Sequence, residues 1–196
     1  YYNLSTLSQM DIYLFKQGSY TKMYEKFGAH PMTHKGKKGV HFAVWAPNAK
    51  SVCVRGDFND YKIDAHPLQL RSDDSGIWEG FIEDIAIGLT YKYHIVSLFH
   101  NIVHEKSDPF AFYSEVAPKS ASRIYELDNY KWNDKKWMEK RYKNNACDSP
   151  ISVYEMHVGS WRRNPLEDNR YLTYKELALE LVPYLKEMNY THVEFM

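Results

Sequence analysis

The fold class follows from residues 39–57, which read GVHFAVWAPNAKSVCVRGD. Apolar side chains occupy every second position in residues 40–44, and the alternation resumes in residues 52–54. A period of two is typical of a β-strand with one buried face. The Ala46-Pro47-Asn48 triplet between the two runs favours a turn. The stretch therefore predicts two half-buried strands joined by a short connection.

The same pattern continues over the middle of the chain. Further strands are expected in four segments, namely residues 77–82, 90–96, 101–104 and 124–127. Turn residues such as Asp73-Asp74-Ser75-Gly76 precede or separate them. Short strands at intervals of about 8 to 12 residues are typical of an antiparallel sandwich. We therefore predict a mainly β fold, with an antiparallel β-sandwich over residues 36–128.

Residues 1–35 are expected to form a helical segment ahead of the sandwich. An apolar stripe with the spacing i, i+3, i+4 and i+7 is made by Tyr20, Met23, Tyr24 and Phe27. Gly28 follows at the position of a left-handed helix cap. We predict two short helices within residues 4–27 and a loop over residues 28–39, which are rich in Gly and Pro.

The last third of the chain has a different pattern. Residues 129–150 are strongly charged and are expected to form a linker with a short helix, capped by Asn133 or Asp134. Residues 151–159, ISVYEMHVG, are almost continuously apolar. Such a run is typical of a strand that is covered on both faces.

A second helix should begin after Thr173, because Thr173 and Glu176 have the spacing of a capping box. Pro183 should bend this helix, and Asn189 suits its end. Residues 191–196, THVEFM, then read as another strand. Strand, helix and strand in this order predict two parallel strands. Two such strands cannot bury both faces, so we expect residues 151–196 to begin a larger α/β domain.

Composition favours an uncharged ligand. Of the 196 residues, 16% are aromatic, and 25 basic side chains balance 25 acidic ones. A balanced charge gives no long-range attraction to nucleic acid or to an anionic membrane. Two cysteines without a CxxC motif predict neither a disulfide framework nor a zinc site, and no secretory signal is visible. We expect a cytoplasmic protein without a metal.

Reactive motifs are absent from the sequence. It contains no GxSxG, GxxxxGK[ST], GxGxxG or HExxH pattern. His30 and His34 are four residues apart, but Pro31 lies between them, so a helical metal site is not expected. Glu155 and Glu194 fall in the two apolar runs of the last third, where we expect buried, structural carboxylates rather than catalytic ones.

A family resemblance spans nearly the whole chain. It rests on six segments of the sequence, namely GVHFAVWAPNAKSVCVRGDFND, GIWEGFI, YKYHI, KSDPFAFYSEVAPKSASRIY, ISVYEMHVGSWRR and YLTYKELALELVPYLKEMNYTHVEFM. The chain resembles the amino-terminal part of the bacterial 1,4-α-glucan (glycogen) branching enzymes, which belong to the α-amylase superfamily, glycoside hydrolase family 13. The resemblance implies an immunoglobulin-like, glycogen-binding-type sandwich, followed by the first β-α-β unit of a truncated TIM barrel.

The resemblance also implies where the chemistry resides. Branching enzymes transfer an α-1,4-glucan segment to a 6-hydroxyl with an Asp nucleophile, a Glu acid/base and a second Asp, and they need no cofactor. Those three residues belong to later barrel strands, so none is expected within residues 1–196. We expect the chain to be inactive alone, to bind α-1,4-glucan or glycogen, and to pack against the remainder of its own barrel.

Two sugar-binding residues follow from resemblance to the related module of kinase regulatory subunits. Tyr61, after GDFND, takes the place of a sugar-stacking Trp, and Lys92 of YKY takes that of a hydroxyl-binding Lys. No aromatic residue near Glu105 replaces the second stacking Trp. Trp78 and Trp45 are expected in the core.

Two other functions remain open at this stage. The chain could act by itself as a glucan-binding or targeting module, or it could belong to a related debranching or trehalose-releasing α-glucan hydrolase. Trp161 is expected to pack at the domain boundary.

Overall fold

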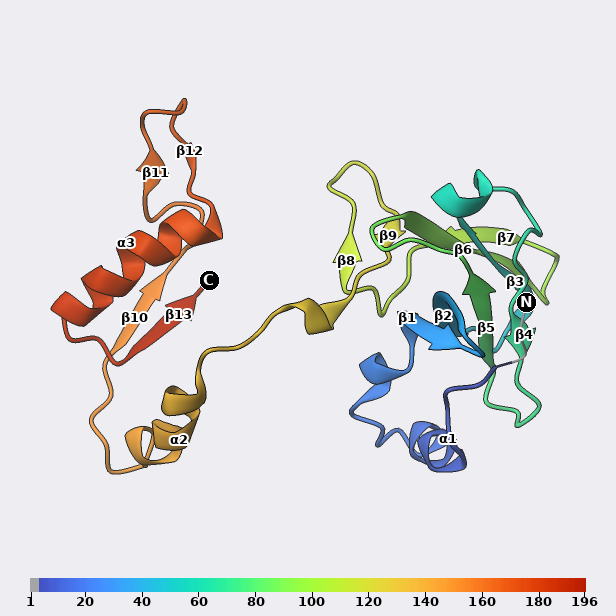
Figure 1. The fold of residues 1–196 in the computed structure, drawn as a ribbon, viewed down its shortest axis with the longest axis horizontal. Helices are drawn as coiled ribbons and strands as arrows, with labels where there is room; N and C mark the ends of the chain where they lie inside the picture. Colours follow the sequence, from blue (N-terminus) through green and yellow to red (C-terminus); the bar gives the residue numbers. More distant parts are fainter. Residues whose placement is uncertain (1–3) are drawn as a thin grey trace. The chain divides into compact units, whose positions relative to one another are not determined.

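A computed structural model describes residues 4–196 of the chain. The chain divides into two compact units, and the boundary between them in the sequence falls between Lys131 and Trp132. Figure 1 shows strands dominating the first unit and a helix beside a pair of strands in the second. No helix in the described part of the chain is long and apolar enough to cross a membrane.

The first unit contains two antiparallel sheets. The strands of one sheet, in spatial order, are β1 (Gly28–His34), β2 (Lys37–Trp45), β5 (Ile77–Glu83) and β4 (Gln69–Leu70). Those of the other are β3 (Ala49–Gly56), β6 (Thr90–Ser97), β9 (Ser122–Arg123) and β8 (Tyr113–Ser114), with β7 (Val103–Lys106) also paired to β6. The mainly β fold class is confirmed.

The principal core lies between these sheets. Alternate side chains of β2 and β5 on one side, and of β3 and β6 on the other, form a single buried cluster. Trp78 belongs to it, as expected, and its indole nitrogen donates to the Ala46 carbonyl at 3.0 Å. The bond satisfies the one polar atom that this large side chain brings into the core.

The prediction that β2 has one buried face is wrong, because its other face is covered as well. Helix α1 (Gln9–Lys16) and the residues around the 3-10 helix η1 (Met23–Glu25) pack on it. This second cluster contains Leu7, Ile12, Tyr20, Phe27 and Ile77. His41 and Ala43, on that face of β2, are therefore fully buried. The alternation within a strand cannot show that another segment of the chain packs on its second face.

The loop predicted over residues 28–39 is also wrong, since Gly28–His34 forms the edge strand β1. Among residues 4–196 its strand partner is β2 alone, with Pro31 opposite Val40. An edge strand tolerates proline because one side of it needs no donor. Lys35 and Gly36, both with positive φ, make the tight turn. The helical prediction for residues 1–35 therefore holds only for α1 and the single turn η1.

The second unit contains the predicted β-α-β arrangement. Its elements are α2 (Lys135–Asn144), β10 (Val153–Met156), the hairpin of β11 (Arg163–Asn164) and β12 (Arg170–Tyr171), α3 (Tyr174–Glu187) and β13 (His192–Phe195). Strands β10 and β13 are parallel, and α3 packs on them through Met156, Leu177 and Leu181. The capping box is confirmed, because Thr173 and Glu176 exchange both hydrogen bonds.

Candidate functional site

Tyr61 lies on the first unit, directly after the 3-10 helix η2 (Asp57–Asn59). Its phenol oxygen is 2.6 Å from Thr90 Oγ1, and the Thr90 hydroxyl donates to Asp57 Oδ2 at 2.8 Å. Because a threonine hydroxyl carries one proton, Tyr61 is the donor in the first bond. The ring is thus fixed at its polar end while the side chain stays partly exposed.

The backbone that carries Tyr61 is strained and is held by specific contacts. Asp60 and Tyr61 have φ of 50° and 54°, a region that costs an L-residue about 1 to 2 kcal/mol. The Tyr61 amide donates to the Gly56 carbonyl at 3.0 Å. Arg55 Nε donates to the Tyr61 carbonyl at 2.5 Å. Strain maintained by such contacts is typical of functional positions.

Lys92 lies on the same face of the β3–β6 sheet as the residue that anchors Tyr61. Thr90 and Lys92 are two positions apart on β6, so their side chains point to one side, about 7 Å apart. Lys92 Nζ donates to Ser120 Oγ at 2.9 Å. The two residues singled out in the sequence are therefore brought onto one sheet face.

The positions beside Lys92 on this face hold ionisable side chains, and the second sugar-stacking ring of the related module has no counterpart there. Arg55 is opposite Lys92 in the β3–β6 register, and its guanidinium lies 2.5 Å from Glu105 Oε1. His94 Nδ1 approaches the same oxygen at 2.6 Å. Glu105 therefore orders Arg55, and through it the strained turn at Tyr61.

A second aromatic surface, which we call the Trp45 pocket, was not expected. Trp45 ends β2 and is 55% exposed, so its assignment to the core is wrong. The indole nitrogen donates to the Ser75 carbonyl at 3.0 Å, and Phe15 meets the indole edge-on at 5.9 Å. Phe27, Phe110 and Tyr20 line the same pocket, with Lys16, Asp74 and Ser75 among its polar residues.

The carboxylates of Glu155 and Glu194 in the second unit are not buried. Glu155 and Glu194 are directly paired across β10 and β13, and both are exposed, so the expectation of buried structural carboxylates is wrong. No group of three His, Cys, Asp or Glu in the described residues could hold a metal ion. Trp161 packs inside this unit, donating to the Tyr154 hydroxyl and meeting Tyr184.

Comparisons with known proteins cover the segment that contains Tyr61, Lys92 and Trp45. Residues 26–111 match carbohydrate-binding module 48, the isoamylase N-terminal domain. The 1,4-alpha-glucan branching enzyme GlgB of Aquifex aeolicus (strain VF5) is 50% identical over 98% of this chain. That of Gloeobacter violaceus (strain ATCC 29082 / PCC 7421) is 45% identical over the same share. The chain is a relative of the 1,4-alpha-glucan branching enzymes. It spans 30% and 26% of the length of these two relatives.

Solved structures show the same fold. An apo pullulanase from Klebsiella pneumoniae aligns over 87% of this chain and 20% of its own, with a TM-score of 0.61 and 23% identity. A putative alpha amylase from Salmonella typhimurium aligns over 87% of this chain and 24% of its own, with a TM-score of 0.60 and 21% identity.

The position of Trp45 in β2 explains why the sequence pattern of this chain did not predict the Trp45 pocket. Trp45 shares the parity of His41 and Ala43, whose face of β2 is buried under the amino-terminal segment. Trp45 lies at the end of the strand, where Phe15 covers only its edge. Trp45 is paired with Ile77 of β5, so nothing in the alternation of the sequence distinguished this exposed ring from a buried one.

Proposed function

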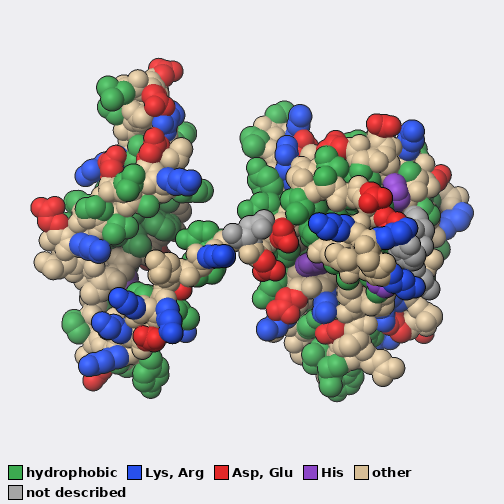
Figure 2. All heavy atoms as spheres, in the orientation of Figure 1, with side chains coloured by type: hydrophobic (Ala, Val, Ile, Leu, Met, Phe, Trp, Pro, Cys, Tyr) green, Lys and Arg blue, Asp and Glu red, His purple; other side chains and the backbone are tan. Residues whose placement is uncertain are grey.

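We propose that the first unit binds α-1,4-glucan and that the chain is part of a 1,4-α-glucan branching enzyme. The observation that carries the proposal is the anchored ring of Tyr61 on one sheet face with Lys92, inside the segment that matches a carbohydrate-binding module. A glucose unit offers an apolar face to a ring and hydroxyls to polar neighbours. Figure 2 shows acidic and basic side chains mixed over the visible surface, which suits a neutral polymer.

The Trp45 pocket supports the same function with a second surface. Its rings give an apolar wall, and Lys16, Asp74 and the Ser75 carbonyl lie at or near its rim. An aromatic wall with a few polar groups is the usual make-up of a sugar site. The module then has two separate places at which one long glucan chain can be held, and tethering at both raises the apparent affinity.

The reaction of the whole enzyme is proposed from its relatives. It is the transfer of an α-1,4-linked segment to a 6-hydroxyl, giving an α-1,6 branch during glycogen synthesis in the cytoplasm. The catalytic Asp, Glu and Asp belong to barrel strands outside these 196 residues, so this chain is inactive alone. Strand β13 is exposed along its whole length, which fits a partner in the remainder of the barrel.

The proposed boundaries of the parts follow the sequence analysis. The amino-terminal segment covers residues 1–35, the module residues 36–128, the linker residues 129–150 and the start of the barrel residues 151–196. A stand-alone targeting module or a related debranching hydrolase is the competing function. Product analysis of the longer protein on amylose separates them, because a branching enzyme makes α-1,6 links and little free sugar.

Calorimetry with maltoheptaose tests glucan binding by the chain itself. We expect weak binding that Tyr61→Ala reduces by about tenfold, the factor that corresponds to one aromatic contact. Phe99→Ala is the matched control, since Phe99 is an exposed ring on the turn between β6 and β7. Absence of heat with the unaltered chain, or equal affinity in Tyr61→Ala, would refute the proposal.

A further inference from the structure

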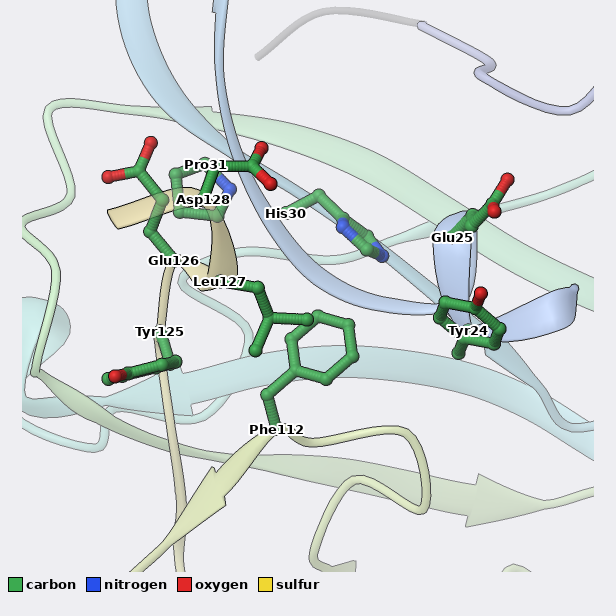
Figure 3. Close-up of a pocket in the computed structure, with 9 residues that line it drawn as sticks. All are labelled: Tyr24, Glu25, His30, Pro31, Phe112, Tyr125, Glu126, Leu127 and Asp128. Atoms are coloured by element: carbon green, nitrogen blue, oxygen red, sulfur yellow. The ribbon is translucent and has the colours of Figure 1, made fainter. Parts of the chain in front are cut away.

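A third pocket lies on the first unit, next to the Trp45 pocket but lined by a different set of residues. Figure 3 shows the phenyl ring of Phe112 between Tyr24 and Glu25 on one side and Glu126 and Asp128 on the other. We call it the Phe112 pocket. His30 and Pro31 of β1 also line it, and His30 meets the Phe112 ring edge-on at 5.7 Å. Only those two residues lie inside the segment that matches the carbohydrate-binding module.

The walls of the Phe112 pocket combine apolar and aromatic surface. Phe112 and Leu127 contribute apolar groups, and the rings of Tyr24 and Tyr125 add further area. Phe112 is partly exposed, and both tyrosines are more so. A flat ring that is open to solvent on one side is the surface on which the C–H face of a sugar packs.

The charged and imidazole groups of the pocket leave acceptor atoms for a ligand. The side-chain carboxylates of Glu126 and Asp128 form no hydrogen bond or ion pair with another side chain in the described part of the chain. His30 Nε2 lies 2.9 Å from the Phe27 carbonyl. Since a carbonyl only accepts, Nε2 carries the proton of the ring. Burial lowers the pKa of His30, so the ring is neutral near pH 7 and Nδ1 is an acceptor.

A ligand for this pocket must therefore bring donors together with an apolar face. A sugar unit meets both needs, because its hydroxyls donate to carboxylates and its C–H groups pack on rings. A bare metal ion does not fit, since the described residues offer no cluster of three ligands. We propose that the Phe112 pocket is an additional binding site for a glucose unit of an α-glucan. The inference rests on the proposed glucan-binding function.

The test is a titration of the whole chain with maltotriose, followed through assigned backbone amide signals. Signals from residues 24–31, 112 and 125–128 should shift together with one dissociation constant. Phe112→Ala should weaken that constant about tenfold and leave the response around Tyr61 unchanged. Phe99→Ala, which removes an exposed ring outside the pocket, should change neither response.

A second variant keeps the inference testable if Phe112→Ala perturbs folding. Replacing Glu126→Gln and Asp128→Asn together preserves shape and removes two charged acceptors, so it should weaken the same constant severalfold. The inference is overturned if maltotriose shifts the signals around Tyr61 but not those of the Phe112 pocket. It is also overturned if agmatine, a guanidinium cation, shifts the pocket signals and maltotriose does not. If maltotriose shifts no signals around Tyr61, in the Trp45 pocket or in the Phe112 pocket, the glucan-binding proposal is rejected as well.

Discussion

Gly76 and Trp45 approach so closely that a methyl group added to Gly76 would lie 3.3 Å from the indole nitrogen of Trp45. The same group would lie 2.7 Å from the Pro47 Cβ. Gly76 has φ of 74° in the turn before β5, a conformation that glycine adopts without strain. The Trp45 pocket therefore depends on a glycine at this turn, which leaves the indole free to reach the Ser75 carbonyl.

Replacing Gly76→Ala should lower the free energy of unfolding of the first unit by about 2 to 4 kcal/mol, because backbone strain and overpacking add. Gly18→Ala is the matched control, since Gly18 has φ of 70° but nothing within 4 Å of an added Cβ. It should show the strain alone, about 1 to 2 kcal/mol. If urea unfolding shows the same loss of unfolding free energy for Gly76→Ala and Gly18→Ala, the contact of the added methyl group with Pro47 and Trp45 has no energetic cost.

Asp108 is a buried carboxylate that anchors the segment leading to Phe110 and Phe112. It accepts from the hydroxyls of Tyr91 and Tyr93 at 2.6 and 3.0 Å and from the Phe110 amide at 2.8 Å. Asp108→Ala leaves three donors without this acceptor and should lower the unfolding free energy by about 3 kcal/mol or more.

Tyr93→Phe tests the same network from its donor side, because it removes a donor and leaves no buried group unpaired at that position. It should cost about 1 kcal/mol in the same thermal or urea unfolding measurement. A loss in Asp108→Ala no larger than that in Tyr93→Phe would contradict the role of Asp108 as a shared acceptor.

Glu79 should make the stability of the first unit depend on pH in the acid range. Burial alone would raise its pKa, but the neighbouring His41 and Ser5 side chains and the Arg71 guanidinium together hold the pKa below 4.5. Arg71 lies 2.6 Å from the carboxylate. Because the folded pKa is lowered, this stabilisation is present above pH 4.5 and is lost as the pH falls through the folded pKa.

Glu79→Gln should therefore be less stable than the unaltered chain by about 3 kcal/mol near pH 7, and the difference should shrink below pH 4.5. Urea unfolding between pH 3 and pH 7 measures it. Asp60→Asn is the control, because the Asp60 side chain is largely exposed and its nearest cation, Lys62, is 3.7 Å away. A difference that is constant with pH would contradict the linkage.

Local sequence signals were sufficient where a segment makes its own contacts. The capping box at Thr173 and Glu176 and the strand at residues 40–44 depend on residues a few positions apart, and both were predicted correctly, although the burial of both faces of that strand was not. The edge strand β1 was missed because Pro31 and the glycines resemble loop residues. Their strand role depends on pairing with β2 and on the open edge beyond.

The candidate sites divide in the same way. Tyr61 and Lys92 follow recognisable short motifs, and the hydrogen bond from Tyr61 to Thr90 brings them onto one sheet face. Trp45 was assigned to the core because, like Trp78, it lies in a strand with alternating apolar residues, but it is exposed where the cover of the amino-terminal segment ends. The Phe112 pocket joins segments near residues 25, 30, 112 and 126, a combination that no local pattern contains.

Trp45 offers a direct optical test of the second glucan surface. Because maltoheptaose would cover its indole and remove water from it, binding should change the tryptophan fluorescence of the chain. Trp45→Phe should abolish most of that change. Trp137→Phe is a matched control, since Trp137 is also 55% exposed but lies on α2 of the second unit. If Trp137→Phe abolishes the change and Trp45→Phe preserves it, the Trp45 pocket is not a glucan surface and binding involves the second unit instead.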